Sequence, residues 1–409
     1  MPALRSVARF EPFVGLRYDR SRVNLDDVVA PPYDVLTEAE REDLAARDHA
    51  NIVRVDVPPE SDGAGRYERA ALTLAQWMDE GILQADEEPS FTLYRMAFTD
   101  EAGRSRSTVG VIGALEVTPD GAGPADGNGV LPHERTTPKA STDRLELTRA
   151  TRANLSPIWG LSLASGLTGL LLEPGTPLGS TIDDDGVSHT VERVDDPDRC
   201  AAIGAAVAAR AVLIADGHHR YGVSRQYREE RRAENGGLPG PYDLTMTYLG
   251  ELVEEQLSVA PIHRLLDGLP AGRDWLEVLT PWFDTEPAGP ATAELAASLV
   301  ELGALAYVEP DGTATLLRPR ADRFDGVRDL DSVRLEHALV DVPHVLRYEP
   351  KLSSVVQALA AGEAQAAVLV RPVSVAEIER TAREGALMPP KSTFFTPKLR
   401  TGLVIRPMD

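Results

Sequence analysis

The residues best suited to chemistry are the five of Asp216-Gly217-His218-His219-Arg220. The apolar run Ala211–Ala215 precedes them and predicts a buried strand, and Tyr221–Glu234 has the pattern of a helix that ends at Asn235-Gly236-Gly237. A strand that passes through a glycine turn into a helix presents the amides of the helix N-terminus to a ligand. This order therefore predicts an anion site at the turn.

The side chains of this turn favour phosphate as the anion. Gly217 allows a ligand to approach the backbone closely, because it has no Cβ. Arg220 can form two parallel hydrogen bonds to phosphate oxygens, and His218 or His219 can donate to a third. Asp216 can orient one of these side chains or hold a metal ion. We expect a phosphorylated ligand to bind here.

Two further segments are rich in polar groups that suit an anion. One follows the Gly-rich loop at 120–129 and contains His133, Glu134, Arg135 and Lys139. The other is Met388–Thr393, where two prolines stiffen the backbone before three donors, Lys391, Ser392 and Thr393. We expect both segments to converge on the Asp216 turn. The tripeptide Thr-Pro-Lys occurs at Thr137 and again at Thr396, which we interpret as coincidence.

The charge of the chain limits its partners. The formal net charge is −22, from 64 acidic and 42 basic residues, which argues against binding to nucleic acid or to anionic lipid. The same charge is typical of proteins from high-salt or acidic proteomes, where it serves solubility. In either case a site for a polyanion must pool its cations locally. We expect a small-molecule substrate as the partner, and a homo-oligomer is left open.

Cysteine content and hydropathy point to a cytoplasmic protein. The one cysteine, Cys200, leads into Ala-rich sequence and is expected to be a buried small side chain rather than a nucleophile. A disulfide framework and a CxxC metal site are therefore excluded. The first 18 residues lack the apolar core of a signal peptide, and no run approaches the ~18 apolar residues of a membrane span.

The length and the spacing of apolar residues predict a mixed α/β (α+β) fold. A chain of 409 residues with 43% hydrophobic and 26% charged residues favours two or three domains. We predict an N-terminal α/β segment over 1–120, a phosphate-binding core over 121–260, and a C-terminal α/β segment over 261–409 that completes the site. Within the first segment, the patterns predict a capped helix over Thr37–Ala46, a strand over Asn51–Val57 and a helix over Tyr67–Met78.

The central motif resembles the phosphate-binding motif of the ParB/sulfiredoxin superfamily, including its free serine kinases. Most of the chain also resembles the bacterial and archaeal family called domain of unknown function 1015. Five stretches carry this second resemblance: Ala30–Val35, Leu131–Glu134, Leu155–Trp159, Ala215–Tyr221 and Met388–Thr393. The resemblance implies a ParB/sulfiredoxin-like core with flanking α/β segments packed on it.

The serine kinase resemblance implies an activity and roles for particular residues. Asp216, His218, His219 and Arg220 would be phosphate and catalytic contacts. The kinases also use a glutamate as the base that deprotonates the substrate hydroxyl, and Glu134, beside His133, is the candidate here. Asp34, in the Pro-fixed Ala30–Val35 loop, is the alternative base.

The leading hypothesis is phosphoryl transfer to a small hydroxylated metabolite, with free L-serine as the specific acceptor. The donor is ATP, ADP or pyrophosphate, and we expect Mg²⁺, held by Asp216, because Arg and His alone poorly neutralise a transferring phosphoryl group. One alternative is a hydrolase that binds Zn or Mn through His133, Glu134, Asp216, His218 and His219. Another is a non-catalytic nucleotide-sensing module.

Overall fold

The computed structural model describes residues 8–100, 103–118, 129–132 and 139–408. These residues form two compact units. The first contains residues up to 257 together with 382–386 and 397–409, and the second contains 258–381 and 387–396. The segment predicted as 1–120 and the segment predicted as 121–260, except for its last three residues, thus lie together in the first unit. The mixed α/β fold is confirmed.

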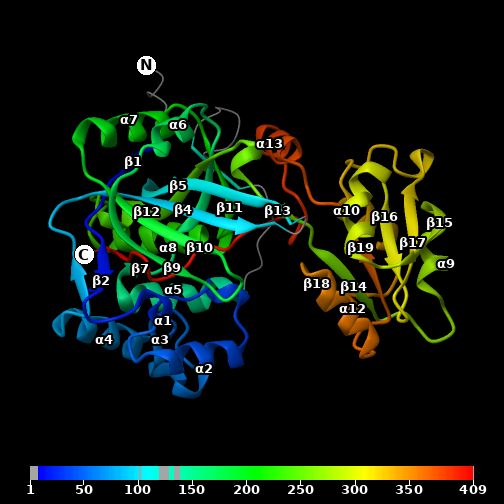
Figure 1. Ribbon diagram of the computed structural model, residues 1–409, viewed down its shortest axis with the longest axis horizontal. Coiled ribbons are helices and arrows are strands. Elements are labelled where there is room, and N and C mark those ends of the chain that lie inside the picture. The colour runs from blue at the N-terminus through cyan, green and yellow to red at the C-terminus, as the bar shows by residue number, and fades with distance from the viewer. Residues whose placement is uncertain (1–7, 101–102, 119–128, 133–138, 409) are drawn as a thin grey trace. The chain divides into compact units, whose positions relative to one another are not determined.

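A nine-stranded sheet forms the centre of the first unit (Figure 1). Its order is β6-β11-β8-β12-β5-β4-β10-β9, and β1 pairs with β5 off this path. The bounds are β1 Phe10–Glu11, β4 Phe91–Thr99, β5 Ser105–Glu116, β6 Val130–Leu131, β8 Ile158–Ser162, β9 Thr176–Ile182, β10 Ser188–Val194, β11 Val212–Asp216 and β12 Leu244–Glu251.

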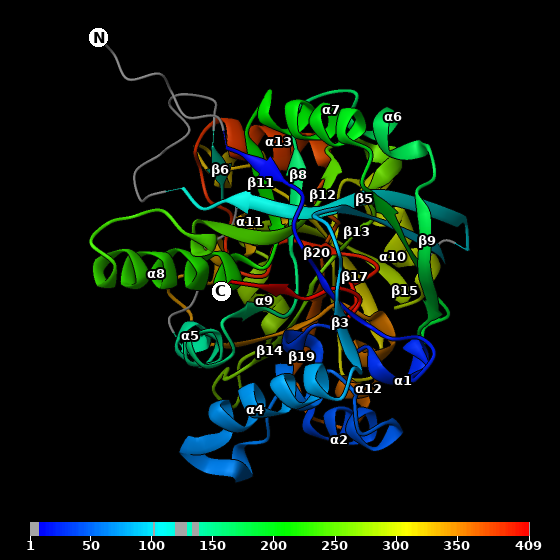
Figure 2. The same cartoon turned by 90° about the vertical axis from the view of Figure 1, so that its left-hand side faces the viewer.

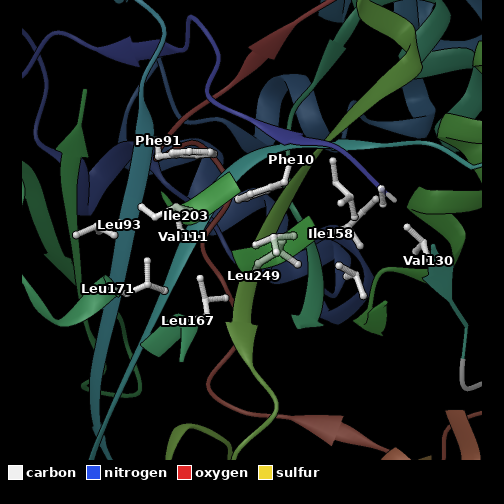
Figure 3. Packing of buried hydrophobic residues seen from close by; sticks show 14 of the residues in the cluster. Phe10, Phe91, Leu93, Val111, Val130, Ile158, Leu167, Leu171, Ile203 and Leu249 are labelled. Atoms are coloured by element: carbon white, nitrogen blue, oxygen red, sulfur yellow. The ribbon is translucent and has the colours of Figure 1, made fainter. Parts of the chain in front are cut away.

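Helices cover both faces of this sheet, as Figure 2 shows. On one face lie α6 (Leu167–Leu172) and α7 (Pro197–Ala208), and on the other lie α5 (Lys139–Thr151) and α8 (His218–Glu234). Phe10 stacks on Phe91 with ring centroids 5.0 Å apart, in a cluster that includes Ile203 of α7 (Figure 3). Cys200 packs against this cluster and is half-buried, in keeping with its expected structural role. This two-sided burial fixes the strand ends from which the site is built.

Smaller elements complete the first unit. The helices are α1 Leu25–Val28, α2 Glu38–Arg47, α3 Val53–Asp56 and α4 Arg66–Asp79, and the strand pairs are β2 Leu16–Tyr18 with β3 Leu83–Ala85, and β7 Ala153–Asn154 with β21 Arg406–Pro407. Short 3₁₀ turns lie at Tyr33–Val35, Glu60–Gly65, Pro241–Asp243 and Glu254–Gln256.

The helix at 38–47 confirms the predicted capping, since Thr37 and Glu40 form a reciprocal capping box. The strand predicted over Asn51–Val57 is wrong, because this segment contains helix α3. The side chain of Asn51 accepts a hydrogen bond from the amide of Val53 and so starts the helical turn.

Helix α4 lies where it was predicted, but its buried face is different. Ala70, Leu74 and Trp77 are buried, whereas Met78 of the predicted face is 45% exposed. The large indole of Trp77 gains more from burial than the alanines do, so the helix is rotated toward it.

The second unit has an antiparallel sheet in the order β15-β17-β16-β19-β14-β18. Its strands are β14 His263–Asp267, β15 Phe283–Pro290, β16 Leu305–Val308, β17 Thr313–Pro319, β18 Val345–Glu349 and β19 Ala366–Leu369, and β13 Val259–Ala260 pairs with β20 Phe394–Phe395. Its helices are α9 Trp275–Leu279, α10 Ala293–Leu302, α11 Asp331–Leu339, α12 Leu352–Ala360 and most of α13 Val375–Arg383, with a 3₁₀ turn at Ala321–Arg323.

None of the helices in the described ranges is long and apolar enough to cross a membrane.

Candidate phosphate-binding site

The predicted turn is the junction between β11 and α8. Gly217 is the N-cap of α8 and has φ +88°, a left-handed conformation that glycine adopts without strain. The pairing of β11 with β8 shifts register between Ile214 and Asp216, so that Asp216 lies opposite Trp159. Such irregularities turn a side chain away from its regular direction. His218 and His219, both half-buried, form the first turn of the helix together with Arg220.

Asp216 is paired with two cations. Its Oδ2 lies 3.2 Å from Nζ of Lys398 and 3.5 Å from a terminal nitrogen of Arg220. Burial alone would raise the pKa of Asp216, but the charges of Lys398, Arg220 and His218 outweigh it and hold the pKa well below its ordinary value. Asp216 is therefore an anion at neutral pH.

Arg220 connects the turn to a second family stretch, Leu155–Trp159. One terminal nitrogen donates to the carbonyl of Pro157 and lies 3.5 Å from Oγ of Ser156, and the other faces Asp216. The guanidinium also lies against the turn itself, because a Cβ on Gly217 would be 2.9 Å from Nε of Arg220. The terminal nitrogens are thus engaged within the protein, and a direct contact of Arg220 with phosphate stays a prediction.

The Ala30–Val35 stretch also reaches this region. Asp34 is exposed on the 3₁₀ turn Tyr33–Val35, and its charge, like that of Asp216, helps to raise the pKa of Arg220 against the opposing effect of burial. Burial raises the pKa of the Tyr33 phenol to about 12. Three of the five family stretches therefore meet around Arg220.

The C-terminal tail holds these segments together. Ala30 and Thr401 exchange two backbone hydrogen bonds, which join the tail to the start of the Ala30–Val35 stretch. Farther along, β21 pairs with β7, directly before the Leu155–Trp159 stretch. The tail thus contributes Lys398 to the site and holds the Ala30–Val35 and Leu155–Trp159 stretches through its pairing with Ala30 and β7.

A buried ion pair lies next to Arg220. Nη1 of Arg144 on α5 donates to the backbone carbonyl of Asp56, at 2.6 Å, and lies 3.2 Å from its Oδ1. The Arg144 guanidinium also stacks on the ring of Tyr33, 4.2 Å from its centroid. Burial raises the pKa of Asp56, although Arg144 and Arg220 oppose this rise.

Several predicted site residues are not placed in this arrangement. His133, Glu134 and Arg135 lie outside the described residues, and Lys139 is described only as the first residue of α5. Their roles stay predictions.

Lys391, Ser392 and Thr393 belong to the second unit. There the buried hydroxyl of Ser392 donates to the carbonyl of Pro389, and the carbonyl of Lys391 accepts a hydrogen bond from Arg264. These bonds fix the backbone of the segment. Its convergence with the Asp216 turn and its anion-binding role stay predictions.

Sequence reasoning missed Lys398, Asp56 and Arg144. Lys398 is the lysine of the second Thr-Pro-Lys, which was interpreted as coincidence, and its partner Asp216 is 182 residues away in the chain. Asp56 was assigned to a strand rather than to α3. Arg144 lies among the other charged residues of α5, and no local pattern singles it out.

The described residues do not form a metal site. No group of three or more His, Cys, Asp or Glu side chains in the described part of the chain is arranged to hold an ion. Asp216 is already engaged by Lys398 and Arg220, which would repel a divalent cation. The arrangement does not fit Mg²⁺ held by Asp216, and we derive no step through a metal.

Residues 10–333 match the family described as Protein of unknown function (DUF1015), and the chain belongs to that family. The matched range includes the Asp216 turn and ends before Met388–Thr393. No curated protein matches the chain.

Solved structures resemble the chain at a distance. A free serine kinase in complex with AMP is 14% identical and has a TM-score of 0.35, covering 67% of this chain and 88% of its own. SbnI with a C-terminal truncation, from Staphylococcus aureus, is 14% identical with a TM-score of 0.36, covering 71% and 87%. A conserved hypothetical protein from Pyrococcus furiosus is 14% identical with a TM-score of 0.35, covering 65% and 87%. These values do not identify a ligand, so the functional argument rests on the chain's own side chains.

Proposed function

We propose that this protein transfers a phosphoryl group from a nucleotide or pyrophosphate to a small hydroxylated metabolite, with L-serine as the first acceptor to test. The observation that carries the proposal is the cluster of Asp34, Asp216, Arg220 and Lys398 at the N-terminus of α8. It combines an exposed carboxylate, two cations and a helix start with a glycine N-cap.

Donor phosphates would bind at the start of α8. An αL glycine followed by helical residues turns successive backbone amides toward one side, which favours an anion. Lys398 supplies a cation within reach of the turn, and Arg220 holds Asp216 and Pro157 in place. His218 and His219 would supply further donors from the first helical turn.

The chemical step needs a base beside the acceptor. The acceptor hydroxyl oxygen forms the new P–O bond, and the bond from that phosphorus to the leaving oxygen breaks with its electron pair. The hydroxyl proton passes to a carboxylate, for which Glu134 and Asp34 are the two candidates. Asp34 is exposed and its charge acts on Arg220, so it is the candidate that the described residues support.

The test is transfer from ATP, ADP or pyrophosphate to L-serine in the presence of Mg²⁺, with phosphoserine detected by mass spectrometry. Replacing the base should lower turnover by about a hundredfold or more while donor binding survives. Asp34→Asn and Glu134→Gln are compared with Glu42→Gln, which removes an exposed carboxylate of α2 and should leave turnover intact.

Each other result has a defined meaning. Absence of phosphoserine with all three donors would remove the serine kinase proposal. Binding of AMP or ADP by calorimetry, without turnover on any acceptor, would indicate the nucleotide-sensing module. Stoichiometric Zn or Mn in the purified protein would favour the hydrolase.

A further inference from the structure

A small cavity, partly open to solvent, lies beside the site, and most of the residues that line it are polar. It has a volume of about 40 Å³, which corresponds to about three water molecules. The polar side chains that line it come from α3, α5, α8, β7, β12 and the Leu155–Trp159 stretch: Asp56, Arg144, Thr148, Asn154, Ser156, Arg220, Ser224 and Thr245.

Two of these side chains have a buried polar atom that has no hydrogen-bond partner among the residues that the structure describes. Oδ2 of Asp56 is one, although the residue is only 3% exposed and its other oxygen faces Arg144. Nε of Arg220 is the other. An unsatisfied buried polar atom is costly and rare in a native protein, so each such atom calls for a ligand or a solvent molecule.

The two atoms demand opposite partners. A carboxylate oxygen accepts hydrogen bonds and attracts a positive charge, whereas Nε of an arginine donates. The hydroxyls of Ser224 and Thr245 already bond to each other, at 2.9 Å. A group with a donor at one end and an acceptor at the other satisfies both atoms, and a positive charge on the donor suits the carboxylate of Asp56.

Resting on the function proposed above, we propose that this cavity is the acceptor subsite and that Asp56 binds a protonated amino group of the acceptor. The acceptor class is then a small hydroxylated amine or amino acid, and neutral polyols and hydroxy acids are excluded. The volume suits the amino group with the carbon atoms next to it. Asp56 acts as a specificity-determining residue, and Arg220 contacts the acceptor oxygen as well as the turn.

The placement of the cavity fits this assignment. Arg220 lines the cavity and also contacts Asp216 at the start of α8, so one side chain borders both the acceptor and the donor phosphates. Ser156 likewise lines the cavity and lies beside the same guanidinium. An acceptor whose amino group is held at Asp56 would thus keep its hydroxyl group on the side of the cavity that faces the turn.

The experiment measures binding, separately from turnover, on the full chain by calorimetry with and without AMP. The probes are L-serine and ethanolamine, which carry an amine, and glycolate and glycerol, which do not. L-serine and ethanolamine should bind, and the other two should bind at least about tenfold more weakly, because hydrogen bonds to charged groups are the strong ones. Equal binding of glycerol or glycolate would overturn the proposal, as would binding of none of the four.

Variants locate the subsite. Asp56→Asn should weaken L-serine binding at least about tenfold while AMP binding persists, which also shows that the variant is folded. Asp143→Asn is the matched control, because Asp143 pairs with the same Arg144 but does not line the cavity, and it should bind L-serine normally. If Asp56→Asn fails to fold, Thr245→Val tests the same wall.

Failure of the subsite and failure of the kinase proposal are distinguishable. Amine-selective binding without phosphoryl transfer would retain the subsite and refute the kinase. Transfer to glycerol as efficient as transfer to L-serine would retain the kinase and refute the subsite.

Discussion

Replacing Lys398 with methionine tests whether the tail stabilises the β11–α8 junction. The change keeps most of the aliphatic stem and removes the charge that lies 3.2 Å from Asp216. Lys398 is 16% exposed and Asp216 23%, so water screens the pair only in part. Breaking a fully buried pair costs about 3–5 kcal/mol, and an exposed pair contributes about 0–1 kcal/mol. Because Asp216 keeps Arg220, we expect a loss of about 1–3 kcal/mol.

Hydrogen exchange monitored by mass spectrometry measures this loss locally, in peptides that cover β11 and α8, independently of the second unit. A double-mutant cycle with Asp216→Asn isolates the coupling between the two side chains. The control cycle uses Arg47 and Asp184, an exposed pair at 2.7 Å, which should show at most about 1 kcal/mol of coupling. Coupling in the Lys398 cycle no larger than in the control would refute the reasoning.

The sign of the pH dependence follows from the lowered pKa of Asp216. A carboxylate whose pKa is lower in the folded state contributes stability above its unfolded pKa, about 3.9, and loses it as the pH falls further. The difference between Lys398→Met and the parent chain should therefore be largest at neutral pH and shrink below about pH 4. A difference that grows on acidification would contradict the assignment.

Three further predictions concern single side chains. Arg220→Lys should speed hydrogen exchange in α8 and weaken AMP binding measured by calorimetry. The reason is that one ammonium cannot reach both Pro157 and Asp216 in the geometry of a guanidinium. Gly217→Ala should weaken AMP binding more than Gly186→Ala does, since both have positive φ but only the first places a Cβ against Arg220; equal effects would remove the crowding argument. Burial lowers the pKa of His263 to about 4 from 6.5, so acid should destabilise the second unit by up to about 3 kcal/mol between those pH values. Urea unfolding of His263→Gln should lack this pH dependence, and an unchanged profile would move the effect elsewhere.

The sequence was most informative where local patterns decide the structure. The apolar run before Asp216 and the helical pattern after it predicted the β11–α8 junction, because a glycine turn between them has few alternatives. The capping box at Thr37 was equally local. The segment around Asp56 was misassigned because four residues with alternating polarity are compatible with a strand or with one helical turn. There the side-chain bond of Asn51 decided the outcome.

The composition of the site depended on contacts that no local pattern contains. Arg220 reaches Pro157 across 63 positions, and Lys398 reaches Asp216 across 182. The tail that carries Lys398 pairs with Ala30 and with β7, and these pairings are set by packing of the whole unit. The family stretches at Ala30–Val35 and Leu155–Trp159 indicated which loops mattered, but not that they meet at one guanidinium.

An anion site at the β11–α8 junction is compatible with a net charge of −22 because charge acts locally in salt solution. A charge that lies farther from the turn than the Debye length, about 8 Å at physiological ionic strength, is largely screened. Close to the turn, the cations Lys398 and Arg220 balance the carboxylates of Asp216 and Asp34, and the start of α8 adds roughly half a positive charge. A phosphate therefore meets a local excess of positive charge that comes from fixed, partly buried groups. Because those groups are shielded from solvent, added salt should slow the approach of the anion more than it weakens the bound state.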